Sequence, residues 1–198
     1  TFHSICARLL RRDAPLIGVD RNFAIFDSDD QTNVVKAVLT ELNIDEKKYK
    51  PAAIHSVISN AKNELIWPEQ FQAKTYFEEV AKRVYERYNQ VLRANNALDF
   101  DDLLMETVRL LQQNQPVCER LQDRYLHVLV DEFQDTNITQ YTLVKLISGK
   151  HRNLFVVGDP DQSIYRWRGA DYRNVQRLNE DFRDLQVISL EQNYRSTK

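Results

Sequence analysis

The stretch that decides the fold of this chain reads Tyr125-Leu126-His127-Val128-Leu129-Val130-Asp131-Glu132-Phe133-Gln134-Asp135-Thr136-Asn137. Its first six residues are mostly apolar, which is typical of a strand buried on both faces of a parallel sheet. Two adjacent carboxylates follow, and a helix is expected to start at Thr136 or Asn137. Because ligands of open parallel sheets bind outside the carboxyl ends of the strands, Asp131 and Glu132 are expected at a binding edge. The alternative is an acidic turn that binds nothing.

The two carboxylates suit a magnesium site. Mg²⁺ takes one or two protein carboxylates and fills its other positions with water and phosphate. Asp131 would hold the ion, largely through water, with Glu132 as the second candidate ligand. Glu132 would also be the catalytic base that activates an attacking water.

Two further apolar runs end in polar residues. The run at residues 153–157 leads into Gly158, which permits a tight turn, and then to Gln162, which could contact a phosphate oxygen or orient a water. The run at residues 186–190 is followed by Tyr194 and Arg195, a ring and a guanidinium that suit a base and a phosphate. Three strand ends with polar side chains on one edge predict an α/β fold with a ligand site.

The residues at these strand ends are VDEFQDTN (130–137), VGDPDQSIYRWRGA (157–170) and QNYRST (192–197). They closely resemble motifs II, III and IV of the UvrD/Rep-like superfamily 1 DNA helicases. In addition, TFHS (1–4) resembles the start of the family's motif Ic, and ALDFDDLL (97–104) resembles its motif Id. The matches follow the family's order from the first residue to the last few. The resemblance implies ATP-dependent 3′-to-5′ movement on single-stranded DNA.

The resemblance also implies a domain organisation. The fold would be a partial RecA-like parallel sheet flanked by helices, with an all-helical insertion. Residues 1–12 would be a helix of RecA-like domain 1A, residues 13–97 approximately the helical subdomain 1B, and residues 98–198 the remainder of domain 1A. The residues themselves fit an insertion of helices, because Pro51 can open one helix and an apolar stripe predicts a long one from about Glu69 to Asn95.

For nucleotide binding, the resemblance implies ATP and Mg²⁺ as cofactors of the complete protein. Glu132 would activate water beside the metal ligand Asp131. Gln162 would sense the terminal phosphate, Tyr194 would stack on the adenine, and Arg195 would reach the terminal phosphate.

For DNA binding, the resemblance implies contacts to single-stranded DNA and DNA junctions from residues spread along the chain. The residues are Thr1, His3, Phe100, Tyr165, Trp167 and Arg168. A base stacked on an aromatic ring contributes about 1–3 kcal/mol. Two alternatives remain open at this stage: Phe100 could be a core residue behind a helix cap at Asp99, and Trp167 could anchor a loop in the core.

Composition limits the classes of protein. The chain has 198 residues, of which 42% are hydrophobic, and a formal net charge of −2, which argues against a strongly basic coat for nucleic acid. DNA binding must therefore come from local sites. Cys6 and Cys118 fit neither a disulfide framework nor a metal site, and no segment has the pattern of a signal peptide or a membrane span. A cytoplasmic location is expected, associated with the nucleoid in a bacterium.

The sequence contains no G-x-x-x-x-G-K-[ST] loop among its four glycines, and no late arginine motif of the family. We therefore expect an internal piece of a longer helicase that is inactive alone. Two alternatives are the helicase part of a helicase–nuclease, and a module that holds single-stranded DNA or a protein partner without turnover.

Overall fold

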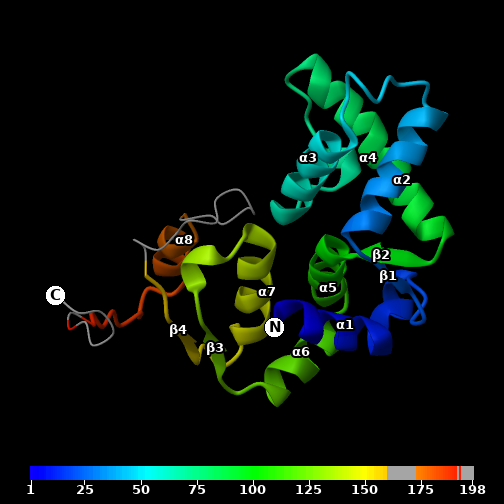
Figure 1. Cartoon of the computed structure of the whole chain (residues 1–198). Coiled ribbons are helices and arrows are strands. Elements are labelled where there is room, and N and C mark those ends of the chain that lie inside the picture. The colour runs from blue at the N-terminus through cyan, green and yellow to red at the C-terminus, as the bar shows by residue number, and fades with distance from the viewer. Residues whose placement is uncertain (160–172, 191, 193–198) are drawn as a thin grey trace.

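The computed structural model describes residues 1–159, 173–190 and 192 (Figure 1). The helices are α1 (Phe2–Asp13), α2 (Ser28–Glu41), α3 (Pro51–Asn63), α4 (Tyr76–Ala94), α5 (Phe100–Gln113), α6 (Gln115–Arg124), α7 (Ile138–Ser148) and α8 (Arg173–Asp181). Short 3-10 helices are η1 (Ala14–Ile17), η2 (Pro68–Gln70) and η3 (Phe133–Asp135), and the strands are β1 (Ala24–Phe26), β2 (Ala97–Asp99), β3 (Val128–Val130) and β4 (Leu154–Val156). The fold is α/β with a large helical part, as the sequence predicts.

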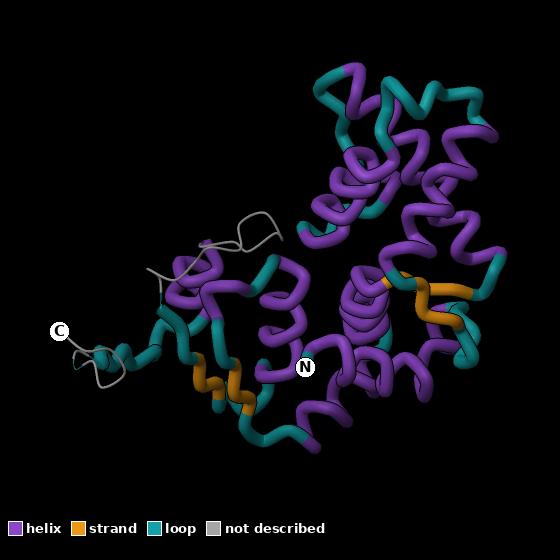
Figure 2. The backbone as a smooth tube through the Cα atoms, viewed as in Figure 1, coloured by secondary structure: helices purple, strands orange, loops and turns teal. Residues whose placement is uncertain are grey.

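Helix α5 lies at the centre of the molecule and packs against α1 and α7 (Figures 1 and 2). Its apolar side chains share one core with those of α1, α6 and α7, and Leu10, Val108 and Leu110 are fully buried in this core. Helices α2, α3 and α4 form a second group with a core of their own. Within the described part of the chain, no helix combines the length and apolar character needed to cross a bilayer.

The long helix of the second group starts later than predicted, at Tyr76 and not near Glu69. Thr75 sets this start, because its hydroxyl accepts a hydrogen bond from the Glu78 backbone nitrogen at 3.2 Å and Glu78 Oε2 accepts one from the Thr75 backbone nitrogen at 3.1 Å. This reciprocal pair is a capping box. The preceding residues form η2 and an extended segment.

The strands form two separate parallel pairs. Ala24 pairs with Ala97 in the first sheet, and Val128 pairs with Leu154 in the second. In residues 13–30, Pro15, Gly18 and the acidic group of Asp27, Asp29 and Asp30 predict a loop that leads into a helix cap. The structure adds β1 within this stretch, and Asp27 is the acid that caps α2.

The predicted strand at residues 125–130, with both faces buried, is wrong in length and burial. Helices α7 and α8 cover the face that carries Val128 and Val130. Side chains alternate along a strand, so Leu129 and Phe155 point the other way and are 73% and 57% exposed. Although the sequence of this strand is apolar on both faces, the described residues bury only one of them.

The third predicted strand, at residues 186–190, does not form. These residues have no regular secondary structure, and Val187, Ile188 and Leu190 are exposed. A strand needs a neighbour for its backbone hydrogen bonds, and in the described part of the chain β3 pairs with β4 only. The structure instead has α8 before this segment, which the sequence reading missed.

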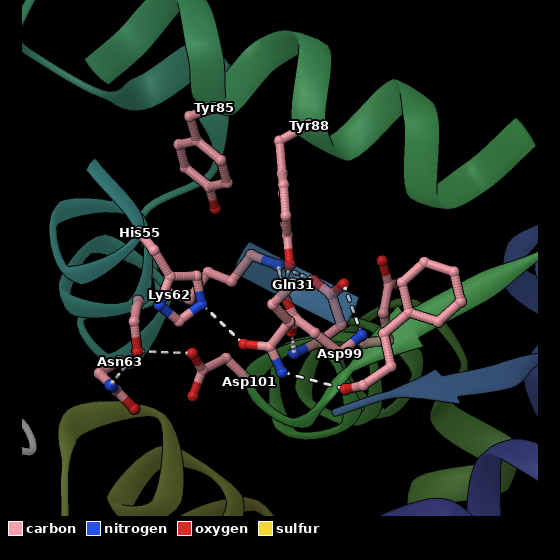
Figure 3. A network of polar contacts seen from close by, with 12 residues as sticks. Gln31, His55, Lys62, Asn63, Tyr85, Tyr88, Asp99 and Asp101 are labelled. Atoms are coloured by element: carbon pink, nitrogen blue, oxygen red, sulfur yellow. Dashed lines mark hydrogen bonds and ion pairs between the residues drawn. The ribbon is translucent and has the colours of Figure 1, made fainter. Parts of the chain in front are cut away.

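A buried ion cluster joins the two helical groups (Figure 3). Lys62 of α3 is 1% exposed, and its Nζ donates to Asp99 Oδ2 at 2.5 Å and to Asp102 Oδ1 at 2.7 Å. The Tyr88 hydroxyl of α4 donates to Asp99 Oδ2 at 2.9 Å. Burial alone would lower the pKa of Lys62, but the carboxylates of Asp102 and Asp99 raise it overall, so the amine is charged. The cluster holds α3 and α4 against the start of α5.

Asp101 adds a polar contact at the edge of this cluster. Its Oδ2 accepts a hydrogen bond from the Ser59 hydroxyl at 2.7 Å. Burial, and then the negative charge of Asp99, raise the pKa of Asp101 to about 6. The charged form of Asp101 is therefore disfavoured in the folded protein.

Replacing Lys62 with alanine should destabilise the protein by about 3–5 kcal/mol, because two buried carboxylates lose their cation. Chemical denaturation followed by circular dichroism measures this change. Lys36→Ala, on the exposed face of α2, is the control and should change the free energy of unfolding by less than about 0.5 kcal/mol. Equal effects of the two substitutions would contradict the assignment of Lys62.

Asp101→Asn should stabilise the protein at neutral pH. An acid whose folded pKa is raised binds its proton more tightly in the folded state, so its contribution to stability is full below about pH 4 and falls as pH rises through about 6. Asparagine avoids this loss, and the melting temperature should rise by about 2–4 °C near pH 7.5. The difference from the wild type should vanish near about pH 4. Glu46→Gln, which replaces an exposed acid between α2 and α3, is the control, and it should change the free energy of unfolding by less than about 0.5 kcal/mol.

Candidate functional site

The two predicted carboxylates lie where β3 ends, and the chain turns sharply there. Glu132 has φ 50° and ψ 43°, a left-handed conformation that side-chain-bearing residues rarely adopt. The short helix η3 follows, and Asn137 then caps α7 by accepting a hydrogen bond from the Gln140 backbone nitrogen at 2.8 Å. The predicted helix start is confirmed. Strained backbone of this kind is concentrated at functional sites.

Both carboxylates face solvent. Asp131 and Glu132 are exposed, and Asp131 Oδ1 accepts a hydrogen bond from the Glu132 backbone nitrogen at 3.0 Å. Glu132 Oε2 accepts one from Gln134 Nε2 at 2.7 Å. Exposed carboxylates on two consecutive residues at a strand end are ligands of the kind that a hard cation such as Mg²⁺ prefers, so the chemistry of these residues fits that ion.

The end of β4 lies directly beside the end of β3. The Val157 backbone nitrogen donates to Val130 O at 2.9 Å, and the Phe133 backbone nitrogen donates to Val157 O at 2.9 Å. These bonds continue the strand pairing to the carboxylates. The predicted meeting of these two strand ends is confirmed.

Gly158 is needed for close approach and not for the tight turn that the sequence suggests. Within the described residues, Gly18 is the glycine with a positive φ, and Gly158 is not. A Cβ on Gly158 would lie 2.8 Å from Gln134 Oε1 and 3.3 Å from the Gln134 backbone nitrogen. The next residue, Asp159, donates its backbone N–H to Gln134 Oε1 at 3.0 Å.

Three of the predicted DNA contacts lie in the described residues. Thr1 caps α1 by accepting a hydrogen bond from the Ser4 backbone nitrogen at 3.3 Å. His3, on the first turn of α1, lies edge-on to the ring of Phe100, with centroids 5.7 Å apart. Phe100 is 45% exposed, so the core alternative is wrong, while its contact with DNA stays a prediction.

His3 borders an open pocket of about 590 Å³ between α1, α3, α5 and α7. Most of the residues that line the pocket have polar side chains, among them Asn63 and Asp101. Burial lowers the pKa of His3, so its ring is neutral at physiological pH and offers one donor and one acceptor. An exposed aromatic ring beside a neutral imidazole can stack on a base and hydrogen-bond to it.

The other predicted site residues lie outside the described residues, and their roles stay predictions. They are Gln162, Tyr165, Trp167, Arg168, Tyr194 and Arg195.

Sequence reasoning missed two residues that support these sites. Gln134 lies within the quoted motif but was given no role there. Lys62 carried a readable signal, because it continues the buried stripe of Ile54 and Ile58 at a spacing of four. A lysine on a core face requires a buried anion nearby.

The sequence of this chain is similar to those of known proteins. Residues 1–183 match the UvrD/REP helicase N-terminal domain. The chain is 50% identical over 200 aligned residues to the ATP-dependent DNA helicase PcrA of Bacillus subtilis strain 168, and the match covers 100% of the chain. The PcrA proteins of Staphylococcus epidermidis RP62A and Staphylococcus aureus COL are 50% and 51% identical to it over the same length.

The chain spans 27% of the length of each of these relatives. Its matched part includes α1, the helical group α2–α4 and both sheets. The chain belongs to the UvrD/REP helicase family, within the N-terminal domain of that family.

Proposed function

We propose that this chain is part of an ATP-dependent 3′-to-5′ DNA helicase that couples hydrolysis of Mg-ATP to movement on single-stranded DNA. The observation that carries the proposal is the pair Asp131 and Glu132, exposed at the end of β3 beside the end of β4. It is supported by the whole-chain similarity to proteins named ATP-dependent DNA helicase.

In this proposal the residues have separate tasks. Asp131 would hold Mg²⁺, with Glu132 close to the same ion, and the bound ion would neutralise charge on the phosphates. Glu132 would take a proton from the attacking water. Gln162 would contact the terminal phosphate, with Tyr194 on the adenine and Arg195 on the phosphate.

The DNA path would use a different surface. His3 and Phe100 would contact the single strand together with Thr1, Tyr165, Trp167 and Arg168, near a junction with duplex DNA. We also propose that the helical unit within residues 13–97 is subdomain 1B, and that residues 1–12 and 98–198 belong to domain 1A. The protein would act in the cytoplasm, on the nucleoid.

Glu132→Gln in the full-length protein should abolish DNA-stimulated ATP hydrolysis, because an amide cannot take the proton of the attacking water. Affinity for single-stranded DNA should stay close to that of the wild type. A steady-state phosphate-release assay and fluorescence anisotropy with a labelled oligonucleotide measure the two quantities. Substantial hydrolysis by the variant would remove Glu132 from its catalytic role.

Phe100→Ala should weaken binding of single-stranded DNA by about 1–3 kcal/mol, or roughly 5- to 150-fold in Kd, because a stacked base loses its ring. Tyr76→Ala is the matched control, since Tyr76 is also an exposed aromatic residue at a helix start, in the other helical group. Anisotropy titrations at fixed salt give both dissociation constants. An unchanged Kd for Phe100→Ala would place the single strand elsewhere.

A second candidate function is a module that holds single-stranded DNA without turnover. It is favoured by the ring of Phe100, which is 45% exposed and lies edge-on to the half-buried ring of His3. DNA binding by the chain itself, unaffected by added Mg-ATP, would support this candidate.

A further inference from the structure

A single buried amide joins the two strand ends of the candidate nucleotide site. Gln134 is 4% exposed, although it lies only two residues after the exposed Glu132. Its Nε2 donates to Glu132 Oε2 at 2.7 Å, and its Oε1 accepts from the Asp159 backbone nitrogen at 3.0 Å. The side chain therefore spans from the carboxylate after β3 to the backbone after β4.

The orientation of this amide is fixed by its partners. An ionised carboxylate only accepts hydrogen bonds, and a backbone N–H only donates them. The Gln134 side chain satisfies both neighbours with its nitrogen toward Glu132 and its oxygen toward Asp159, and the reversed amide would satisfy neither. Glutamine supplies the donor and the acceptor on one planar amide, and asparagine, which carries the same amide, is shorter by one methylene.

The surroundings hold the amide in place. Gly158 passes so close that a Cβ there would lie 2.8 Å from Gln134 Oε1, so the contact depends on glycine at this position. The Phe133 backbone nitrogen, one residue before Gln134, donates to Val157 O at 2.9 Å and fixes the backbone from the same strand. The hydrogen bond from the Asp159 backbone and the close approach of Gly158 therefore restrict where the amide can lie.

Glu132 needs such support. Its backbone is left-handed, and its carboxylate is exposed at the end of a flexible side chain. A free glutamate side chain samples several rotamers, and ordering it costs conformational entropy. The hydrogen bond from Gln134 selects the rotamers that keep Oε2 at the strand end.

We infer that Gln134 is a positioning residue, which holds the carboxylate of Glu132 in place for the attacking water and ties that carboxylate to the backbone at Asp159. The inference rests on the proposed function, because it gives Glu132 the role of the base. Gln134 itself touches neither nucleotide nor DNA in this scheme. Its effect on turnover passes through Glu132.

The test compares variants of the full-length protein in DNA-stimulated ATP hydrolysis. Gln134→Ala removes both hydrogen bonds, and Gln134→Glu keeps the shape of the side chain but places a second carboxylate against Glu132. We expect kcat to fall by about 10–100-fold in both variants, as is typical when the partner of a catalytic group is lost. KM for ATP and affinity for single-stranded DNA should change by less than about twofold, because the lost interaction acts in the transition state.

Two further variants separate positioning from simple destabilisation. Gly158→Ala pushes on Gln134 Oε1 from the other side and should lower kcat in the same way. Gln122→Ala is the matched control, since Gln122 Nε2 donates to Leu146 O at 2.8 Å in an equivalent bond between two helices away from the strand ends. Gln122→Ala should leave kcat at the wild-type value, even if it lowers the melting temperature as much as Gln134→Ala does.

The outcomes distinguish this inference from the proposed function. If the wild-type protein hydrolyses no ATP, the proposed function and the inference both fail. If the wild type is active and Glu132→Gln is not, but the Gln134 variants keep the wild-type kcat, the inference alone is overturned. A fall in kcat for Gln122→Ala as large as for Gln134→Ala would also overturn it, because destabilisation would then explain the loss.

Discussion

The positive charge of Lys62 has to be compensated inside the protein, and the arrangement of the helices depends on it. A buried ammonium without a partner costs several kcal/mol, so α3 can pack at its observed place only where carboxylates meet it. Asp99 and Asp102 supply them from the first turn of α5, where they also form its capping box. Phe100 follows Asp99 directly. The ion pair of Asp99 with Lys62 therefore also fixes the position of the exposed Phe100 ring beside His3.

Helix α7 links this cluster to the strand ends. The Thr139 hydroxyl donates to the backbone oxygens of Lys62 and Asn63 at 2.9 and 3.1 Å, and Asn137 Nδ2 donates to Asn63 Oδ1 at 2.5 Å. The same helix starts right after the turn that carries Glu132. The N-terminal end of α7 therefore binds the chain at Lys62 and Asn63 through buried hydrogen bonds, and it directly follows the turn that carries Glu132.

The starts of the helices could be predicted from the sequence, whereas the length and burial of the strands could not. Caps and helix starts depend on neighbours in the chain, so Asp27, Asp99 and Asn137 could be assigned as caps or helix starts from their positions. The length and burial of a strand depend on which partners reach it. That is why the run at residues 125–130 gave a strand of three residues with Leu129 exposed, and the run at residues 186–190 gave none.

The candidate site shows the same division. The carboxylates could be found because they follow an apolar run, which is a pattern along the chain. Gln134 could not, because its partner is a backbone N–H that lies beyond the next helix and strand, beside a glycine without a Cβ. Lys62 lies between these cases: its place on an apolar stripe predicts a buried anion, while only the fold decides that Asp99 and Asp102 provide it. A charged or polar residue at a core position therefore predicts a buried partner for its side chain, and the structure is needed to identify which residue that partner is.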